Sequence, residues 1–485
     1  RIAGRLCKVL PRRSFGNMGA ATAKITESSV VTNGAGRLIL ALDAAKKQLP
    51  GYWGDFVGSG MKTEALPGKA PAKTVRPLRV LHVLDHSWPV HTGYSIRSLH
   101  LIAAQYRLGL RPQALTGPLQ MVDDPDAVET VVENISYRRT PFRGKFSEWA
   151  ISRRRPILRE AMVVRLIRNR ILELTANESV DLIHAHSPAL CGLGALQAAR
   201  SKGIPFVYEL RAFWEDAAVD QKKTAALSLR YRLSQKLENY VVHRADSVVG
   251  IAQSILDELK KRRTDPAKLF HVPNGVDVEK FSPVSRDEGL AARLGLGGEP
   301  VLGFIGSLYR WEGVAWLVHA VAELRGRGTA CKLLIVGDGE EMPAVREAVR
   351  QLNAEDFIQV LGRVPHGEIE RYYSLVDVLV YPRHSIRLTE LVTPLKPLEA
   401  MALGKAILGS DVGGIRELVE PEKTGVLYRA DNVEDFCVQA KRLLSQTSLQ
   451  CKLGEEARKF ILREKDWNVL AQRYIDVYDF AIRNH

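Results

Sequence analysis

The stretch RLTELVTPLKPLEAMALG, residues 387–404, joins cationic and acidic side chains to a predicted helix start. Thr393 is a favourable N-cap and Pro394 suits the first helical turn, while Gly404 can end the helix about three turns later. Glu399 then lies in a short helix whose N-terminus we expect to face a cleft. This arrangement places a carboxylate and several cations where a ligand can reach them.

The charges of this stretch suit a ligand that carries a ribose and a diphosphate. A carboxylate at Glu399 can accept hydrogen bonds from both ribose hydroxyls. Lys396, one turn earlier, and Arg387, on the preceding loop, can neutralise a diphosphate without a metal. The stretch therefore predicts a site for an activated nucleotide.

Two glycine-containing turns precede this stretch. The predicted strand 301–305 leads into Gly306 and Ser307 and then into an apolar-periodic helix. Free backbone N–H groups and a positive dipole end at such a turn suit a phosphate, although a purely structural turn fits equally well. After the predicted strand 332–336, Asp338 disfavours a phosphate, so the structural interpretation is favoured there.

Short apolar strands alternate with amphipathic helices along most of the chain, which indicates parallel sheets covered on both faces. A cluster of proline and glycine at 281–300 marks the boundary between two such domains. In open α/β sheets, ligands bind at the carboxyl ends of the strands. The predicted strands are 78–84, 181–185, 206–209, 247–251, 301–305, 332–336, 358–361, 376–381, 406–410 and 425–428.

The length and composition agree with two globular domains. A chain of 485 residues is too long for one core, and 46% of its residues are apolar. No apolar run is long enough to span a membrane. The five cysteines are scattered without zinc-type spacing, and no secretory signal precedes them, so we expect a reduced, cytoplasmic protein.

The net charge of +14 is unevenly distributed. Residues 1–77 hold 13 Lys and Arg against 4 Asp and Glu, a net +9, which leaves +5 for the rest. A second basic stretch, 138–170, has 11 basic and 2 acidic residues with aromatic residues between them. It fits either an anionic membrane surface or a solvated helix face. Without a zinc-finger or RNA-binding signature, we expect no nucleic-acid partner.

Six motifs occur in an order that resembles one enzyme family. Residues 397–418 (PLEAMALGKAILGSDVGGIREL) resemble the signature of the retaining GT-B glycosyltransferases of family 4, the glycosyltransferase group 1 enzymes. The resemblance extends over residues 78–480. Three segments are more narrowly similar to the subgroup associated with exopolysaccharide and exosortase gene clusters, namely 82–98, 208–220 and 387–402.

This resemblance implies a GT-B fold, in which two Rossmann-like domains face each other across a cleft. It divides the chain into a basic extension (1–77), an acceptor-side domain (78–283), a nucleotide-sugar domain (284–462) and a C-terminal helix packing back on the first domain (463–485). It further implies metal-independent transfer of a hexose, with retention, from a nucleotide sugar to a saccharide or lipid-linked acceptor. No cofactor is expected, and the enzyme would act in the cytoplasm, peripherally at the inner face of the membrane.

The family's donor contacts can be placed on individual residues. Glu399 would hold the ribose, Arg363 and Val364 would contact the base, and Gly93 would approach the donor phosphate. Arg211 stands where many members place a histidine near the transferred sugar. The assigned donor-binding residues are Gly93, Gly306, Ser307, Arg363, Val364, Arg387, Glu390, Val392, Thr393 and Glu399.

Two departures from the family pattern concern charge. Leu391 stands where the first glutamate of the E-x7-E motif is expected, so Glu390 is the nearest candidate. Ser307 and Glu312 occupy the phosphate-loop positions of the family's usual Arg and Lys. A departing diphosphate still needs positive charge. We expect this charge from Arg310, Arg387 and Lys396, with Arg211, Arg310 and Lys396 assigned as catalytic.

His184 and His186 form an i, i+2 pair that points to one side of a strand. The sequence shows no third ligand nearby, so no metal site is predicted. One is expected to be a core histidine and the other to lie at the strand end. His186, with His91 and Tyr94 of an earlier loop, is assigned to the acceptor side.

Two other functions use similar features. A GT-B-shaped sugar-nucleotide epimerase shares the scaffold but needs carboxylates that abstract a sugar proton, and no such set can be assigned here. A non-catalytic protein that binds nucleotide sugars or anionic lipids is favoured by Ser307 and Glu312, which remove cations from the phosphate loop.

Overall fold

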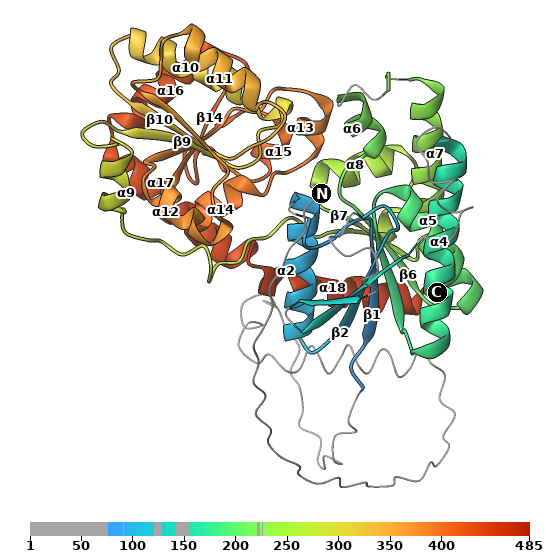
Figure 1. Cartoon of the computed structure of the whole chain (residues 1–485). Helices are drawn as coiled ribbons and strands as arrows, with labels where there is room; N and C mark the ends of the chain where they lie inside the picture. Colours follow the sequence, from blue (N-terminus) through green and yellow to red (C-terminus); the bar gives the residue numbers. More distant parts are fainter. Residues whose placement is uncertain are drawn as a thin grey trace, which may run out of the picture.

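The computed structural model describes residues 76–485 apart from residues 91, 121–128, 133, 142–155, 221–223 and 226. The chain forms two lobes, each with a sheet at its centre (Figure 1). The predicted basic extension 1–77 lies outside the described residues except for its last two positions.

The first lobe is built on an eight-stranded sheet in the order β3-β4-β2-β1-β5-β6-β7-β8. Every neighbouring pair is parallel except β3 with β4, which is antiparallel. The strands are β1 (Arg79–Leu84), β2 (Arg111–Thr116), β3 (Glu129–Val132), β4 (Ile135–Arg139), β5 (Leu182–His186), β6 (Phe206–Leu210), β7 (Ser247–Gly250) and β8 (Leu269–His271).

Helices cover both faces of this sheet, as a parallel sheet requires. On one face α5 packs against α4 and α7, and on the other α2 packs against α18, the last helix of the chain. The helices of this lobe are α2 (Gly93–Arg107), α4 (Pro156–Asn177), α5 (Ala189–Lys202), α6 (Trp214–Asp220), α7 (Leu229–Arg244), α8 (Gln253–Lys261) and the 3-10 turn η1 (Pro266–Lys268).

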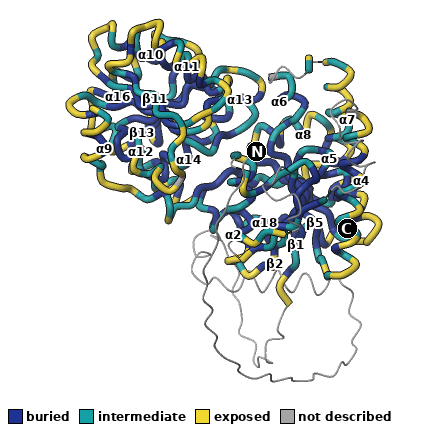
Figure 2. Tube along the Cα trace, viewed as in Figure 1, coloured by how far each residue is buried: buried dark blue, intermediate teal, exposed yellow. Residues whose placement is uncertain are grey.

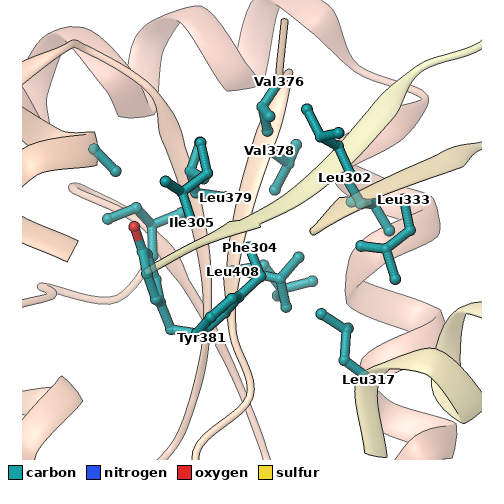
Figure 3. Packing of buried hydrophobic residues seen from close by; sticks show 14 of the residues in the cluster. Leu302, Phe304, Ile305, Leu317, Leu333, Val376, Val378, Leu379, Tyr381 and Leu408 are labelled. Carbon is teal, nitrogen blue, oxygen red and sulfur yellow. The ribbon is translucent and has the colours of Figure 1, made fainter. Parts of the chain in front are cut away.

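The second lobe holds a six-stranded, fully parallel sheet in the order β11-β10-β9-β12-β13-β14. Its central strands are almost entirely apolar and fully buried, and their side chains interlock with Leu317 of α10 (Figure 3). The strands are β9 (Val301–Ile305), β10 (Lys332–Val336), β11 (Ile358–Gly362), β12 (Val378–Tyr381), β13 (Ala406–Ser410) and β14 (Val426–Tyr428).

The helices of the second lobe follow the strands in alternation. Two of them, α13 and α14, lie between β12 and β13 and carry the residues of the stretch 387–404. The helices are α9 (Glu288–Arg293), α10 (Val314–Gly326), α11 (Met342–Gln351), α12 (Ile369–Ser374), α13 (Arg387–Leu391), α14 (Lys396–Ala402), α15 (Gly413–Arg416), α16 (Val433–Leu444) and α17 (Thr447–Glu464), with 3-10 turns η2 (Arg310–Glu312) and η3 (His366–Glu368).

The chain crosses back to the first lobe at its end. Helix α17 packs in the core of the second lobe, whereas α18 (Trp467–Arg483) packs on α2, β6 and β7 of the first. Figure 1 shows α18, in red, running across the blue and green lobe. Trp467, Tyr474 and Tyr478 of this helix are completely buried, so the helix is part of the first core.

The predicted class of two α/β domains with mainly parallel sheets is confirmed. The sequence missed β2, β3, β4 and β8, because polar residues interrupt their apolar pattern and the short β8 is only partly buried. Buried segments, dark blue in Figure 2, run through the centre of both lobes.

The predicted helix start at Thr393 is wrong. Helix α14 begins at Lys396, with Leu395 as its N-cap and Pro397 in its first turn. Thr393 instead lies on the preceding loop, where its backbone carbonyl accepts a hydrogen bond from Asn274 of the first lobe (2.9 Å). The helix is therefore about two turns long and follows a separate short helix, α13.

Candidate active site

A cavity of about 630 Å³ lies between the two lobes at the carboxyl ends of the central strands. The first lobe contributes the start of α2 and the loops after β6, β7 and β8. The second lobe contributes the loops after β9, β10, β11 and β12 and the start of α14. The lining residues that bear on function are Gly93, Tyr94, Arg97, Arg211, Trp214, Asn274, Gly306, Ser307, Tyr309, Trp311, Glu312, Asp338, Arg363, Val364, Arg383, Val392, Thr393, Lys396 and Glu399.

The glycine turn after β9 forms the floor of the cavity on the side of the second lobe. Gly306 has φ 144°, which an L side chain rarely adopts, and a Cβ there would collide with the Lys396 side chain. The absence of a side chain at Gly306 therefore lets Lys396 lie across the turn. Ser307 is exposed next to it, and both residues line the cavity.

Lys396 is held by a buried carboxylate. Its Nζ lies 2.9 Å from Oε1 of Glu312, which is only 4% exposed as a side chain. Burial opposes ionisation of Glu312, but Lys396 and Arg383 together lower its pKa. The glutamate that replaces the family's phosphate-loop cation thus orients a cation from another element.

Arg383 is a cleft cation that the sequence analysis missed. It lies just after β12, lines the cavity, and donates from Nη1 to the Val392 carbonyl (2.9 Å). Its Nε lies 3.8 Å from Glu312 and has no hydrogen-bond partner among the residues that the structure describes. An arginine placed two residues after a predicted strand was the sequence signal that could have found it.

Glu399 faces the cavity from the first turn of α14. Tyr373 donates a hydrogen bond to its Oε2 (2.9 Å). Burial raises the pKa of Glu399 to about 7, although the bond from Tyr373 and the charge of Lys396 act in the opposite direction. A ligand that donates hydrogen bonds to this carboxylate would therefore favour its ionised form.

Arg211 is the principal polar group of the first lobe's side. Its guanidinium donates to Glu209 (Nε, 2.9 Å), to the Tyr94 carbonyl and Ser98 Oγ (Nη1, both 2.7 Å), and to His186 (Nη2, 2.8 Å). The ring of Tyr94 lies beneath the guanidinium, 4.2 Å from its carbon to the ring centroid. Arg211 is therefore rigidly held while still lining the cavity.

Most of the predicted site residues meet at this cavity, although their roles remain predictions. Those that line it are Gly93, Tyr94, Arg211, Gly306, Ser307, Arg363, Val364, Val392, Thr393, Lys396 and Glu399. His91 lies outside the described residues.

Two of the predicted phosphate cations do not line the cavity. Arg310 is exposed on η2, where its neighbours Tyr309 and Trp311 stack and line the cavity instead. Arg387 is paired across the domain boundary with Asp216 of α6 (2.7 Å) and Glu258 of α8 (3.2 Å). Both assignments are corrected, because Arg310 is exposed outside the cavity lining and the two acids hold the guanidinium of Arg387.

Glu390 and His186 are also away from the cavity. Glu390 accepts a hydrogen bond from the backbone N–H of Gly413 (2.7 Å) and pairs with Arg416, so it anchors α15. His186 is completely buried beneath Arg211. The prediction that His186 contacts the acceptor is therefore wrong, because a protein side chain covers it.

The histidine pair has a third member that the sequence did not reveal. β1 pairs with β5 in a register that sets His82 directly beside His184. His82, His184 and His186 form a group whose ring nitrogens lie within 4.8 Å of one another. Strand pairing brings together residues 102 positions apart, which sequence spacing cannot show.

Comparison with known families identifies the two lobes separately. Residues 127–280 match the family model described as Glycosyltransferase Family 4, and residues 299–446 match that of Glycosyl transferases group 1. The two matches cover 154 and 148 residues, or 302 of the chain's 485. The chain belongs to these glycosyltransferases. The family predicted from the motifs is thus confirmed at this level, and so is glycosyltransferase activity in general, whereas retention and the exopolysaccharide subgroup stay predictions.

Relatives and solved structures agree with this assignment. The glycosyltransferase is 27% identical over 315 residues to a GDP-mannose-dependent alpha-mannosyltransferase of Mycolicibacterium smegmatis, covering 65% of this chain and 77% of that protein. It is 26% identical to the alpha-maltose-1-phosphate synthase of the same organism, covering 67% and 85%.

Among solved structures, sucrose-phosphate synthase from Thermosynechococcus elongatus superposes with a TM-score of 0.65 at 21% identity, covering 83% of this glycosyltransferase and 98% of that chain. Anabaena HepE, solved in complex with UDP, superposes with a TM-score of 0.62 at 17% identity, covering 82% and 99%. At these identities the similarity establishes the GT-B fold alone.

Proposed function

We propose that this glycosyltransferase moves a hexose from a nucleotide sugar to a saccharide or lipid-linked acceptor, with retention at the anomeric carbon and without a metal. The observation that supports the proposal most directly is that Lys396 and Glu399, one helical turn apart, both line the interdomain cavity. A cation and a carboxylate at this spacing match the diphosphate and the ribose of such a donor.

The donor would lie mainly on the second lobe. Glu399 would accept hydrogen bonds from the ribose hydroxyls, and the backbone beside Arg363 and Val364 would contact the base. Lys396 and Arg383 would neutralise the diphosphate, in place of the Arg310 and Arg387 expected from the sequence. The first lobe would present Arg211 to the sugar and bind the acceptor, and the lobes would close around both substrates.

In the proposed reaction, the bond between the anomeric carbon and the β-phosphate oxygen breaks, and the departing nucleotide takes the electron pair. The acceptor oxygen bonds to the anomeric carbon from the same face, and its proton passes to an oxygen of the departing phosphate. No enzyme carboxylate acts as nucleophile. Lys396 and Arg383 would stabilise the charge that develops on the diphosphate.

Binding and turnover of nucleotide sugars test this proposal. We expect one nucleotide sugar from a panel that includes GDP-mannose and UDP-glucose to raise the Tm, and Glu399→Ala to weaken its binding strongly. Glu347→Ala, on the exposed face of α11, is the matched control and should bind normally. NMR of the product should show the donor's anomeric configuration. An inverted product would refute retention, and binding unaffected by Glu399→Ala would refute the site.

A non-catalytic nucleotide-sugar binding protein is the second candidate, because the Glu312 carboxylate already offsets the charge of Lys396. Such a protein would bind the donor without consuming it. Release of free nucleotide at catalytic rates, dependent on Lys396, would exclude this candidate.

A lipid-linked acceptor would bring the enzyme to an anionic membrane, and the subgroup resemblance supports a role in exopolysaccharide synthesis at the cytoplasmic face. No described helix is both long and apolar enough to cross a bilayer. Helices α4 and α7 both pack against α5, and an ion pair between Arg230 of α7 and Glu160 of α4 (3.5 Å) links them near their N-terminal ends. They expose apolar residues next to arginines, namely Ile157, Leu158, Arg165, Leu229, Arg230, Arg232 and Leu233.

This surface corrects the predicted basic stretch 138–170. Arg139 is buried and donates to Ser87 (2.7 Å) and to the Trp88 carbonyl (2.8 Å), so it cannot meet a membrane. Arg138 pairs with Glu178 (2.6 Å). The aromatic residues of that stretch lie outside the described residues. The exposed arginines of α4 and α7 are therefore the ones to test.

Flotation with vesicles that contain phosphatidylglycerol tests the membrane proposal. We expect a variant with Arg165, Arg230 and Arg232 changed to Ser to float at least about fivefold less than the unchanged protein. The control changes three exposed arginines of the second lobe, Arg350, Arg429 and Arg463, to Ser. Equal flotation of the two variants would refute the assignment.

A further inference from the structure

Three histidines meet beneath the cleft in a fully buried cluster. His82 comes from β1, and His184 and His186 come from β5. None of the three side chains reaches solvent. Helix α18 covers the cluster with Tyr474 and Tyr478, whose rings lie 5.5 and 5.7 Å from the His184 ring.

Arg211 determines which nitrogen of His186 holds the proton. The Nη2 atom of Arg211 lies 2.8 Å from Nδ1 of His186. A guanidinium only donates hydrogen bonds, and its contact with Nδ1 is shorter than the 3.2 Å contact of Glu209 Oε1 with the same nitrogen, so Nδ1 offers its lone pair to Arg211. The single proton of a neutral His186 ring therefore lies on Nε2.

This proton fixes the direction of every following hydrogen bond. His186 Nε2 donates to His82 Nδ1 (3.0 Å), so the His82 proton lies on Nε2 and is donated to Gln105 Oε1 (2.9 Å). The Gln105 amide then donates from Nε2 to the Tyr478 hydroxyl (2.8 Å). Tyr478 in turn donates to His184 Nδ1 (2.9 Å), which leaves the His184 proton on Nε2. All three rings thus take the same tautomer.

The same network leaves no room for a metal ion between His82 and His186. A metal would need a lone pair from both facing nitrogens, but His186 Nε2 holds the proton that it donates to His82 Nδ1. Arg97 and Arg211 both donate to Glu209 beside the cluster, at 3.0 and 2.9 Å, so the surroundings already contain two cations. Burial lowers the pKa of His82 to about 4 and that of His186 to about 3, which agrees with neutral rings.

The network leaves Arg211 with one donor for the cleft. Four of the five guanidinium N–H groups are bound to Glu209, Tyr94, Ser98 and His186. The fifth, on Nη2, has no partner among the described residues, and Arg211 lines the cavity.

We propose that this directed chain of hydrogen bonds, from Tyr478 of α18 through Gln105, His82 and His186, holds Arg211 so that its last N–H points to the transferred sugar. His82, His186, Gln105 and Tyr478 are positioning residues in this proposal. The contact between Arg211 and the transferred sugar rests on the proposed function, whereas the direction of the hydrogen bonds does not. Helix α18 follows directly from α17 of the second lobe, so these hydrogen bonds also connect Arg211 to that lobe.

Long-range ¹H–¹⁵N NMR of the histidine-labelled protein tests the direction of the bonds. We expect His82, His184 and His186 all to hold their proton on Nε2 at pH 7. Arg211→Met removes the donor at one end, so His186 should shift its proton to Nδ1, where Glu209 Oε1 lies 3.2 Å away. A proton on Nδ1 of His186 in the unchanged protein, or one equivalent of zinc retained after dialysis against EDTA, would overturn the proposal.

Tyr478→Phe tests the positioning role without touching the cleft. We expect His184 to lose its fixed tautomer while His186 keeps its own, and kcat to fall about fivefold to tenfold with donor KM nearly unchanged. Tyr428→Phe is the matched control, because that buried hydroxyl has no hydrogen-bond partner in the part of the chain that the structure describes. An unchanged kcat for Tyr478→Phe would refute the positioning role. If the unchanged protein turns over no nucleotide sugar, the proposed function is refuted. The histidine tautomers measured by NMR still test the direction of the hydrogen bonds in that case.

Discussion

The cation that we assign to the donor diphosphate is already paired inside the protein. Glu312 holds Lys396 at 2.9 Å, and the carboxylate is almost completely buried. Lys396 therefore reaches the cleft in a fixed position rather than as a flexible surface charge. Pre-organised charge of this kind acts where negative charge develops in the transition state.

Removing the Lys396 ammonium should slow transfer more than it weakens donor binding. We expect Lys396→Ala to lower kcat about a hundredfold or more, as loss of a transition-state contact does. Because this change leaves Glu312 without its nearest partner, the double variant Lys396→Ala/Glu312→Gln is measured beside it, with Lys423→Ala as a surface control. A double variant with normal kcat would contradict the role of Lys396.

The raised pKa of Glu399 predicts a pH dependence of donor binding. Burial raises this pKa from 4.5 to about 7, so the free site is mostly protonated at pH 6 and mostly ionised at pH 8. Ribose hydroxyls donate to the ionised form, so the donor Kd should improve about tenfold over this interval. Isothermal titration calorimetry of the unchanged protein and Glu399→Gln checks this, because the glutamine variant should show no such slope.

The same pKa shift has the opposite sign for stability. The folded protein binds a proton at Glu399 that the unfolded chain releases near pH 4.5. This contribution is fully present below pH 4.5 and is lost as the pH rises through 7. Glu399→Gln should therefore gain stability relative to the unchanged protein at pH 8 but not at pH 4.

At the scale of elements, the turn after β9 and the start of α14 fit together only because one residue lacks a side chain. Gly306 combines a φ of 144° with direct contact to the Lys396 side chain. Gly337, at the end of the neighbouring β10, has φ 140° and packs on the backbone of Gly306. The two glycines let three loops converge at the floor of the cavity.

Gly306→Ala should displace Lys396 and strain the turn. We expect kcat/KM to fall at least about tenfold while the protein remains folded, since the other side chains of the floor are unchanged. Gly367→Ala, on η3, is the control, because a Cβ there meets no neighbour. Steady-state kinetics and a melting curve check this, and wild-type kinetics for Gly306→Ala would contradict the described packing.

At the scale of the whole molecule, two of the contacts that join the lobes differ in kind. Arg387 of α13 pairs with Asp216 and Glu258 of the first lobe. Helix α18 places the end of the chain in the core of the first lobe. If the lobes close around substrates as proposed, we expect the first contact to break and the second, which is part of a hydrophobic core, to persist.

The variant Arg387→Ala tests whether Arg387 joins the two lobes or binds the donor diphosphate, as the sequence predicts. Because Arg387 is bound to two acids of the other lobe, we expect the donor Kd to change less than about twofold. The scattering profile of the free protein should instead shift towards a wider separation of the lobes. A tenfold loss of donor affinity, similar to that of Glu399→Ala, would restore the phosphate role.

The amino-acid sequence by itself determined the fold and the main features of the site. Val301–Ile305 is a continuous apolar run and Lys332–Val336 is one after its first residue, and the ends of both strands are predicted to the residue because such runs are buried on both faces. Gly306, Lys396 and Glu399 were found because they follow such strands or occupy a family motif. These signals are local, so a single sequence contains them.

Tertiary structure decided which charged groups meet. Arg387 was expected at the diphosphate but is paired with acids 171 and 129 positions away, and Arg383 was missed although it lines the cavity. His82 joined His184 and His186 through strand register, and Tyr478 joined them from the last helix. The partner of a long polar side chain depends on contacts between distant segments, and only the packed structure of both lobes fixes them.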